Sequence, residues 1–331
     1  MLDDLLFTTN AVMPIVAMVA VGYFLKKLNI ITRSGAKEMN KLVFKLFLPV
    51  LLFLNVYNIE SLGGISFWYI GYVSAVVLLV FFLAILCVRF VTDDPKKKGA
   101  WIQATFRSNY ALIGIPLATS IDKLSGSALA TILSAFTIPL FNILAVIALS
   151  VYSGKEGKKA NVKEIVLDII KNPLIDAIAL GGVALLIRFL LAEAGVDFRI
   201  STEPALEWLY SALTQISRVA TPLALIVLGA NFEFTAISSM KKEIITGVAA
   251  RCVIAPIIGL SIALLIGEFS RAEFATFVSA FGTSVAVSTV PMAQEMDSDT
   301  ELAGQLVVWT TVLSAITLFA FIYILKACGI F

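Results

Sequence analysis

The chain has 331 residues, of which 59% are hydrophobic and 15% are charged, and its formal net charge at pH 7 is +2. Soluble domains have about 45–50% apolar residues, so this composition excludes an ordinary soluble domain and predicts an integral membrane protein. The sequence contains no histidine. Histidine-dependent hydrolases and zinc proteases are therefore excluded, and we expect no enzyme activity.

Ten apolar stretches are each long enough to cross about 30 Å of hydrocarbon as a helix. Lipid offers no hydrogen-bond partners to a bare backbone, so these stretches must be helical. The predicted spans are 5–25, 39–57, 65–91, 99–120, 126–152, 173–191, 206–230, 244–267, 274–296 and 302–327. The sequence thus predicts an all-α membrane protein with ten transmembrane helices.

Lysine and arginine favour the cytoplasmic side of a membrane, and here they gather in alternate loops. The loops after spans one, three, five and seven are basic, whereas the loops between them have few bases. This pattern predicts a multi-pass protein of the cell membrane, inner or plasma, with both termini outside. The loop after span nine disagrees, because Glu295, Asp297, Asp299 and Glu301 give it acids and no base. Acids have little weight in this rule, so the topology is kept.

The longest polar stretch, 153–172, separates residues 1–152 from residues 173–331 and is predicted to be a cytoplasmic linker. Each half contains five spans, and an odd number gives the two halves opposite orientations in the membrane. Transporters are often built from such inverted repeats. Prolines recur in matching spans, with Pro116 in span four and Pro291 in span nine. We therefore predict a 5+5 inverted repeat.

Spans four and nine share a helix-breaking pattern. A small polar residue, Asn109 or Ser284, precedes Pro116 or Pro291 by seven positions. Proline lacks a backbone N–H and clashes with the carbonyl four residues earlier, and glycine in the same spans weakens the helix further. Both spans should break near the middle of the membrane. The alternative is a pair of simple proline kinks whose freed carbonyls are capped by nearby serine and threonine.

Broken membrane helices are tolerated where they line protein or a wet cavity. Partial positive charge at the freed helix N-termini suits a carboxylate, so two facing breaks predict a substrate site near the midplane. The candidate binding residues are Asn109, Pro116, Thr283, Ser284, Ser288 and Pro291, with Arg107, Asn142 and Asn55. Asn142 and Asn55 could instead form hydrogen bonds between helices.

Three arginines, Arg107, Arg218 and Arg251, fall in or near apolar spans. A buried charge in a membrane suggests a function, and Arg107 is close enough to Asn109 to attract an anion. The alternative for each arginine is to reach the membrane interface or to pair with an acid such as Glu233.

Several short motifs follow one another along nearly the whole chain. They are Asn40-Lys41-Leu42-Val43-Phe44 with Leu48-Pro49, Asn109 to Pro116, Asn172-Pro173-Leu174, Pro222-Leu223-Ala224-Leu225 with Leu228-Gly229-Ala230, and Val290-Pro291. In this order and spacing, the chain resembles the auxin efflux carrier family, within the wider group of bile-acid, arsenite and riboflavin transporter-like proteins. The plant carriers have a long hydrophilic loop between the halves, so the short loop here favours a prokaryotic member.

The resemblance implies a sodium/proton-antiporter-like or bile-acid-transporter-like fold in which broken helices four and nine cross. It implies a scaffold of helices 1, 2, 6 and 7, a transport part of helices 3–5 and 8–10, and a homodimer joined through the scaffold. By position, Asn109 and Pro116 are the first crossover pair and Pro291 is the second proline. The implied function is secondary transport, by alternating access, of small organic anions such as auxin-like carboxylates, malonate or malate.

Other function classes stay open at this point. An anion channel would show flux without saturation, and a receptor or sensor on a transporter fold would bind without transport. We expect no cofactor and no nucleic-acid partner. Spans four and nine have no acid in their middle, which disfavours a carboxylate proton relay, but sodium coupling, proton coupling and movement driven by the membrane potential all remain possible.

Overall fold

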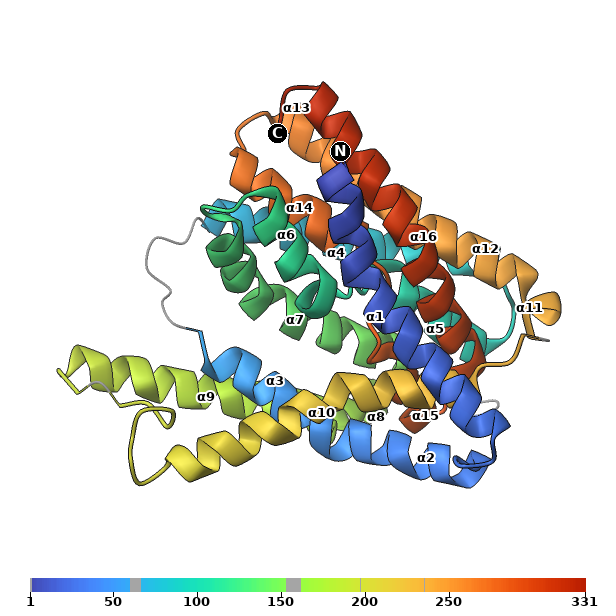
Figure 1. The fold of residues 1–331 in the computed structure, drawn as a ribbon, viewed down its shortest axis with the longest axis horizontal. Coiled ribbons are helices and arrows are strands. Elements are labelled where there is room, and N and C mark those ends of the chain that lie inside the picture. The colour runs from blue at the N-terminus through green and yellow to red at the C-terminus, as the bar shows by residue number, and fades with distance from the viewer. Residues whose placement is uncertain (1, 60–66, 153–161, 197, 235) are drawn as a thin grey trace.

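The computed structural model describes residues 2–59, 67–152, 162–196, 198–234 and 236–331, and its regular elements there are all helices (Figure 1). Within these ranges no β-strand occurs, and one isolated antiparallel bridge pairs Ser108 with Val285. Seven helices of the described chain are long and apolar enough to cross a membrane. The prediction of an all-α membrane protein is confirmed at this level.

The seven long helices coincide with predicted spans. They are α2–η1–α3 (Arg33–Leu42, Val43–Phe47 and Leu48–Tyr57), α4 (Phe67–Val88), α7 (Gly126–Val151), α9 (Pro173–Glu193), α10 (Glu207–Asn231), α12–η3–α13 (Lys241–Ala249, Ala250–Ile254 and Ala255–Ile266) and α16 (Thr300–Ala327). The first predicted span lies in α1 (Leu2–Lys27), and two short helices, α8 (Val162–Ile170) and α11 (Ala236–Ser239), lie between spans.

Predicted spans four and nine are each divided in two. Span four consists of α5 (Pro95–Phe106) followed by η2 (Tyr110–Gly114) and α6 (Ile115–Ile121). Span nine consists of α14 (Arg271–Gly282) and α15 (Thr289–Glu295). The longest uninterrupted helical segments here, α5, α14 and η2–α6, have 12 residues each, or about 18 Å, so none could cross the hydrocarbon alone. The chain leaves helical geometry between the members of each pair.

Three of the prolines follow wide turns rather than breaks. The π-helical turns η1, η2 and η3 each end two residues before a proline, at Pro49, Pro116 and Pro256. A π-turn moves the preceding carbonyls away from the proline ring, which removes the clash of a regular helix. The interruption of span four therefore lies on the N-terminal side of η2, rather than at Pro116 itself.

Close backbone contacts fix the packing of α1 on α10 and of α3 on α9. A Cβ atom added to Gly229 would lie 1.9 Å from the carbonyl oxygen of Val19, and one added to Gly22 would lie 2.0 Å from that of Ile226. On α9, Gly181 faces the backbone of α3 in the same way. Only glycine permits such approaches, because any side chain would occupy the space of the neighbouring main chain.

Loops that sequence places on one side of the membrane meet in space. Three ion pairs join them, and these are Lys26–Glu233 at 3.7 Å, Lys97–Glu243 at 3.3 Å and Lys96–Asp297 at 2.6 Å. The ends of spans one, three, seven and nine therefore share one end of the molecule. The acidic loop after span nine thus pairs with Lys96 of another loop. At the other end, α1 and α16 pack together and both termini emerge on the same side (Figure 1).

Candidate functional site

The two helix interruptions lie against each other. The main-chain amide of Asn109 donates to the carbonyl oxygen of Ser284 at 2.8 Å, and the main-chain amide of Ala286 donates to the carbonyl oxygen of Arg107 at 3.3 Å. Beside this backbone pairing, the hydroxyls of Ser108 and Thr283 are 2.7 Å apart. Backbone groups freed by one break are thus satisfied by the other, as an unwound segment in a membrane requires.

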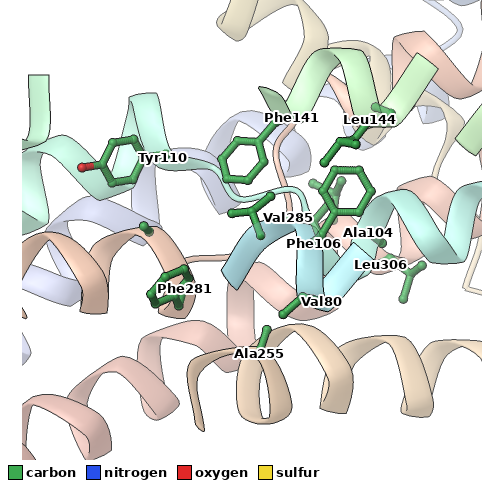
Figure 2. Packing of buried hydrophobic residues seen from close by; sticks show 14 of the residues in the cluster. Val80, Ala104, Phe106, Tyr110, Phe141, Leu144, Ala255, Phe281, Val285 and Leu306 are labelled. Carbon is green, nitrogen blue, oxygen red and sulfur yellow. The ribbon is translucent and has the colours of Figure 1, made fainter. Parts of the chain in front are cut away.

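An apolar cluster holds the paired segments in place. Val285 is completely buried, and Figure 2 shows it among the rings of Phe106 and Phe141. The ring centroids of Phe106 and Phe141 lie 6.4 Å apart, and the amide of Val285 donates to the hydroxyl of Thr310 on α16 at 3.1 Å. This packing makes the interruption a fixed structure, positioned by α5, α7 and α16.

Arg107, the first residue after the end of α5, is 2% exposed. Its guanidinium donates to Oδ1 of Asn142 at 2.7 Å, to Oγ of Ser288 at 2.8 Å and to Oε1 of Gln103 at 3.1 Å. Each of these partners is neutral. No carboxylate of the described residues forms an ion pair with it. A buried charge without a counter-ion is costly, so Arg107 is a candidate for binding an anion.

Polar groups without partners surround the interruptions. Four buried atoms there have no hydrogen-bond partner among the described residues, and they are Nδ2 of Asn109 and the hydroxyl oxygens of Tyr110, Ser284 and Thr289. Each such group costs about 1–3 kcal/mol, and a cluster of them in one place calls for an explanation. Of these four residues, Asn109 and Tyr110 also line the cavity described next.

A cavity of about 70 Å³ lies between the interruptions and helices α3, α7, α9 and α10. Its polar lining residues are Asn55, Arg107, Ser108, Asn109, Tyr110, Asn142, Thr221 and Ser288. Its apolar lining residues are Leu48, Leu51, Leu52, Ala111, Leu112, Ile138, Phe141, Leu174, Ala224, Ala286 and Val287. The lining contains one cation and no acid, and its wall is otherwise mainly apolar.

The structure brings together five of the nine residues predicted to bind substrate. Asn55, Arg107, Asn109, Asn142 and Ser288 all line this cavity. The other four lie outside its lining. Thr283, Ser284 and Pro291 are buried in the packing around the interruption, and Pro116 is exposed on α6.

Arg251 does not line the cavity, and its partners are main-chain carbonyls rather than an acid. It is 1% exposed, and its guanidinium donates to three main-chain carbonyl oxygens, those of Thr283 at 2.8 Å, Ala280 at 3.1 Å and Phe106 at 3.2 Å. These carbonyls belong to the C-terminal ends of α5 and α14. A cation there is stabilised by the partial negative charge of helix C-termini. Sequence spacing gives no sign of this contact, because the partners lie on other spans.

Arg218 is exposed on α10, three residues before Thr221, which lines the cavity. Residues three apart are neighbours on a helix surface, so Arg218 is about one helical turn from a cavity-lining residue, although it does not line the cavity itself. Glu233, the acid considered as a partner for these arginines, instead pairs with Lys26 at 3.7 Å. Pairing of Arg107 or Arg251 with Glu233 is therefore wrong.

Comparisons with known proteins identify a family. A family described as membrane transport protein matches residues 7–322, which is nearly the whole chain. A relative from Methanothermobacter thermautotrophicus, named only as an uncharacterized transporter, is 25% identical over 315 residues, covering 94% of this chain and 96% of its own length. These matches confirm the resemblance to auxin efflux carriers inferred from the motifs. The chain belongs to the membrane transport protein family.

Proposed function

We propose that this protein is a secondary carrier that moves a small organic anion across the membrane by alternating access. The observation that supports it best is Arg107, a buried cation without a counter-ion that lines a cavity together with Asn109, whose side-chain Nδ2 has no partner in the described structure. A carboxylate would neutralise the guanidinium and accept from that amide. A cationic substrate would be repelled, and a neutral one would leave the charge uncompensated.

The chemistry of the lining supports one class of anion over the others. A single cation faces the cavity, and much of the wall consists of leucine, isoleucine, phenylalanine and valine. Such a site suits one carboxylate with an apolar remainder, as in auxin-like acids and shorter monocarboxylates. Malonate and malate would place a second negative charge against a wall that has no second cation, so we propose that they bind more weakly.

The helix packing supports the ten-helix inverted repeat that alternating access requires. Span one packs on span seven through α1 and α10, and span two packs on span six through α3 and α9. In the repeat, span one corresponds to span six and span two to span seven, so the contact of spans one and seven corresponds to the contact of spans six and two. The contact of α4 with α5 and that of α13 with α14 are exchanged in the same way. We therefore include the repeat, and the crossing of broken spans four and nine, in the proposal.

The position of the cavity supports the proposed movement. One side is formed by α3, α9 and α10, which belong to the proposed scaffold, and the other by the interruptions and α7, which belong to the proposed transport part. A shift of one part against the other would expose the same residues to opposite sides of the membrane. A homodimer joined through the scaffold, and both termini outside, complete the proposal.

The test is uptake of radiolabelled acetate, butyrate, indole-3-acetate, malonate and malate into proteoliposomes that contain the purified protein. The proposal predicts uptake that saturates with concentration and prefers monocarboxylates. Flux that rises linearly without saturation would identify a channel. Binding without uptake would identify a receptor, and neither binding nor uptake of any anion would contradict the proposal.

A further inference from the structure

We propose that Arg251 is a built-in cation that occupies the place of a coupling ion, so that the carrier moves its anion without bound sodium or a carried proton. In transporters with interrupted helices, coupling ions bind at the unwound carbonyls and the C-terminal ends of the half-helices. Here a guanidinium donates to those groups. The consequence for transport rests on the proposed function, whereas the site itself rests on the geometry alone.

The acceptors of Arg251 come from both broken spans. Nη1 donates to the carbonyl of Phe106 at the end of α5, while Nε and Nη2 donate to the carbonyls of Thr283 and Ala280 at the end of α14. Main-chain carbonyls at such short range are also the ligands that hard cations use. The arginine therefore takes up the oxygen groups that would otherwise coordinate an ion.

The charges balance without a further cation. Each helix C-terminus is equivalent to about half a negative charge, so the ends of α5 and α14 together are close to the single positive charge of Arg251. The residue is 1% exposed, and no carboxylate in the described ranges forms an ion pair with it. Since the guanidinium is always protonated, this neutralisation does not depend on pH or on sodium.

Arg251 is also fixed in the chain, so it cannot leave its site as an exchangeable ion would. It lies in the π-turn η3 of span eight, and its side chain reaches the interruptions of spans four and nine. Arg107 remains the cation that faces the cavity. With Arg251 already neutralised, binding of one carboxylate at Arg107 neutralises the site. The empty carrier then returns with one positive charge, so each cycle moves one net negative charge and responds to the membrane potential.

The first experiment uses sodium itself as the probe. The Tm of the purified protein is measured in NaCl and in choline chloride at equal ionic strength, for the parent, Arg251→Ala, Arg251→Lys and the exposed control Arg89→Ala. We expect the parent, the lysine variant and the control to have the same Tm in both salts. Arg251→Ala should have a lower Tm in choline and recover it saturably with sodium. A saturable sodium effect on the parent, or none on a folded Arg251→Ala, would overturn the inference.

The second experiment decides the question if Arg251→Ala does not fold. Uptake of the best monocarboxylate by the parent is measured in proteoliposomes with sodium replaced by choline on both sides and with equal pH on both sides. We expect the same rate as with sodium or with a pH gradient present. The rate should increase when a potassium gradient with valinomycin makes the destination compartment positive. A tenfold or greater loss without sodium or without a pH gradient contradicts this inference alone, while absence of anion uptake under every condition contradicts the proposed function.

Discussion

Arg107 and Arg251 contact the same pair of helix interruptions through different kinds of acceptor. Arg251 donates only to main-chain carbonyls that end α5 and α14, whereas Arg107 donates to the side chains of Gln103, Asn142 and Ser288. The first arginine is neutralised by helix dipoles, and the second keeps an uncompensated charge beside the cavity. This difference is the physical basis for separating a structural cation from an anion-binding one.

Arg107→Gln should reduce transport strongly. A hydrogen bond to a charged group contributes about 1.5–3 kcal/mol, so kcat/KM for a monocarboxylate should fall about 10- to 100-fold. Initial rates of uptake over a range of concentrations measure it. The exposed Arg89, substituted in the same way, is the control and should keep the parental value. A parental kcat/KM in folded Arg107→Gln would place the binding site elsewhere.

Asn109→Ala should separate transport from stability. The side-chain Nδ2 of Asn109 is buried without a partner in the described structure, so its removal relieves an unsatisfied group and the Tm should hold or rise. Loss of its bond to the substrate should raise KM by about 5- to 10-fold, which corresponds to about 1 kcal/mol. A lower Tm together with an unchanged KM would show that Asn109 has a structural role instead.

Arg218→Gln should change the approach of the anion rather than the movement of the carrier. Its exposed charge, three residues from the cavity-lining Thr221, should attract anions over a distance, an effect that salt screens. We expect a higher KM, an unchanged kcat and a weaker dependence of uptake on ionic strength. If kcat falls instead, Arg218 takes part in the conformational step.

Gly229→Ala should destabilise the packing of α1 on α10. The new methyl group would lie 1.9 Å from the carbonyl oxygen of Val19, and overpacking of this kind costs about 1–3 kcal/mol. The matched control is Gly182→Ala on α9, where an added Cβ meets nothing within 4 Å. That change should stabilise the helix slightly, by about 0.5–1 kcal/mol. Thermal unfolding of both variants in one detergent compares them, and equal Tm values would contradict the close contact.

Sequence patterns predicted the elements of this molecule better than its contacts. The apolar stretches located the long helices because membrane spans are set by length and composition. The prolines indicated which spans are irregular. They did not locate the interruption in span four, since the π-turn η2 absorbs the clash at Pro116 and the chain unwinds before it. A local rule about proline could not foresee that a glycine, Gly114, leaves room for the ring of Tyr110 within that turn.

The candidate site divides in the same way. Asn109 was identified by its position before Pro116, Arg107 as a charge in an apolar span and Asn142 as a polar group in an apolar span, and the three do meet at one cavity. Arg251 gave the same sequence signal, but its partners are carbonyls that depend on where distant helices end. Side-chain chemistry is visible in a sequence, whereas main-chain acceptors supplied by the fold are not.

Concentration-dependent uptake of a radiolabelled monocarboxylate, compared between the parent and Arg107→Gln in matched proteoliposomes, tests the central claim most directly. We predict saturable uptake by the parent, competition by other monocarboxylates, and a kcat/KM about 10- to 100-fold lower for the variant. Equal saturable uptake by both proteins, with the variant folded, would show that an unpaired arginine at the interruption is not what this carrier uses to hold an anion.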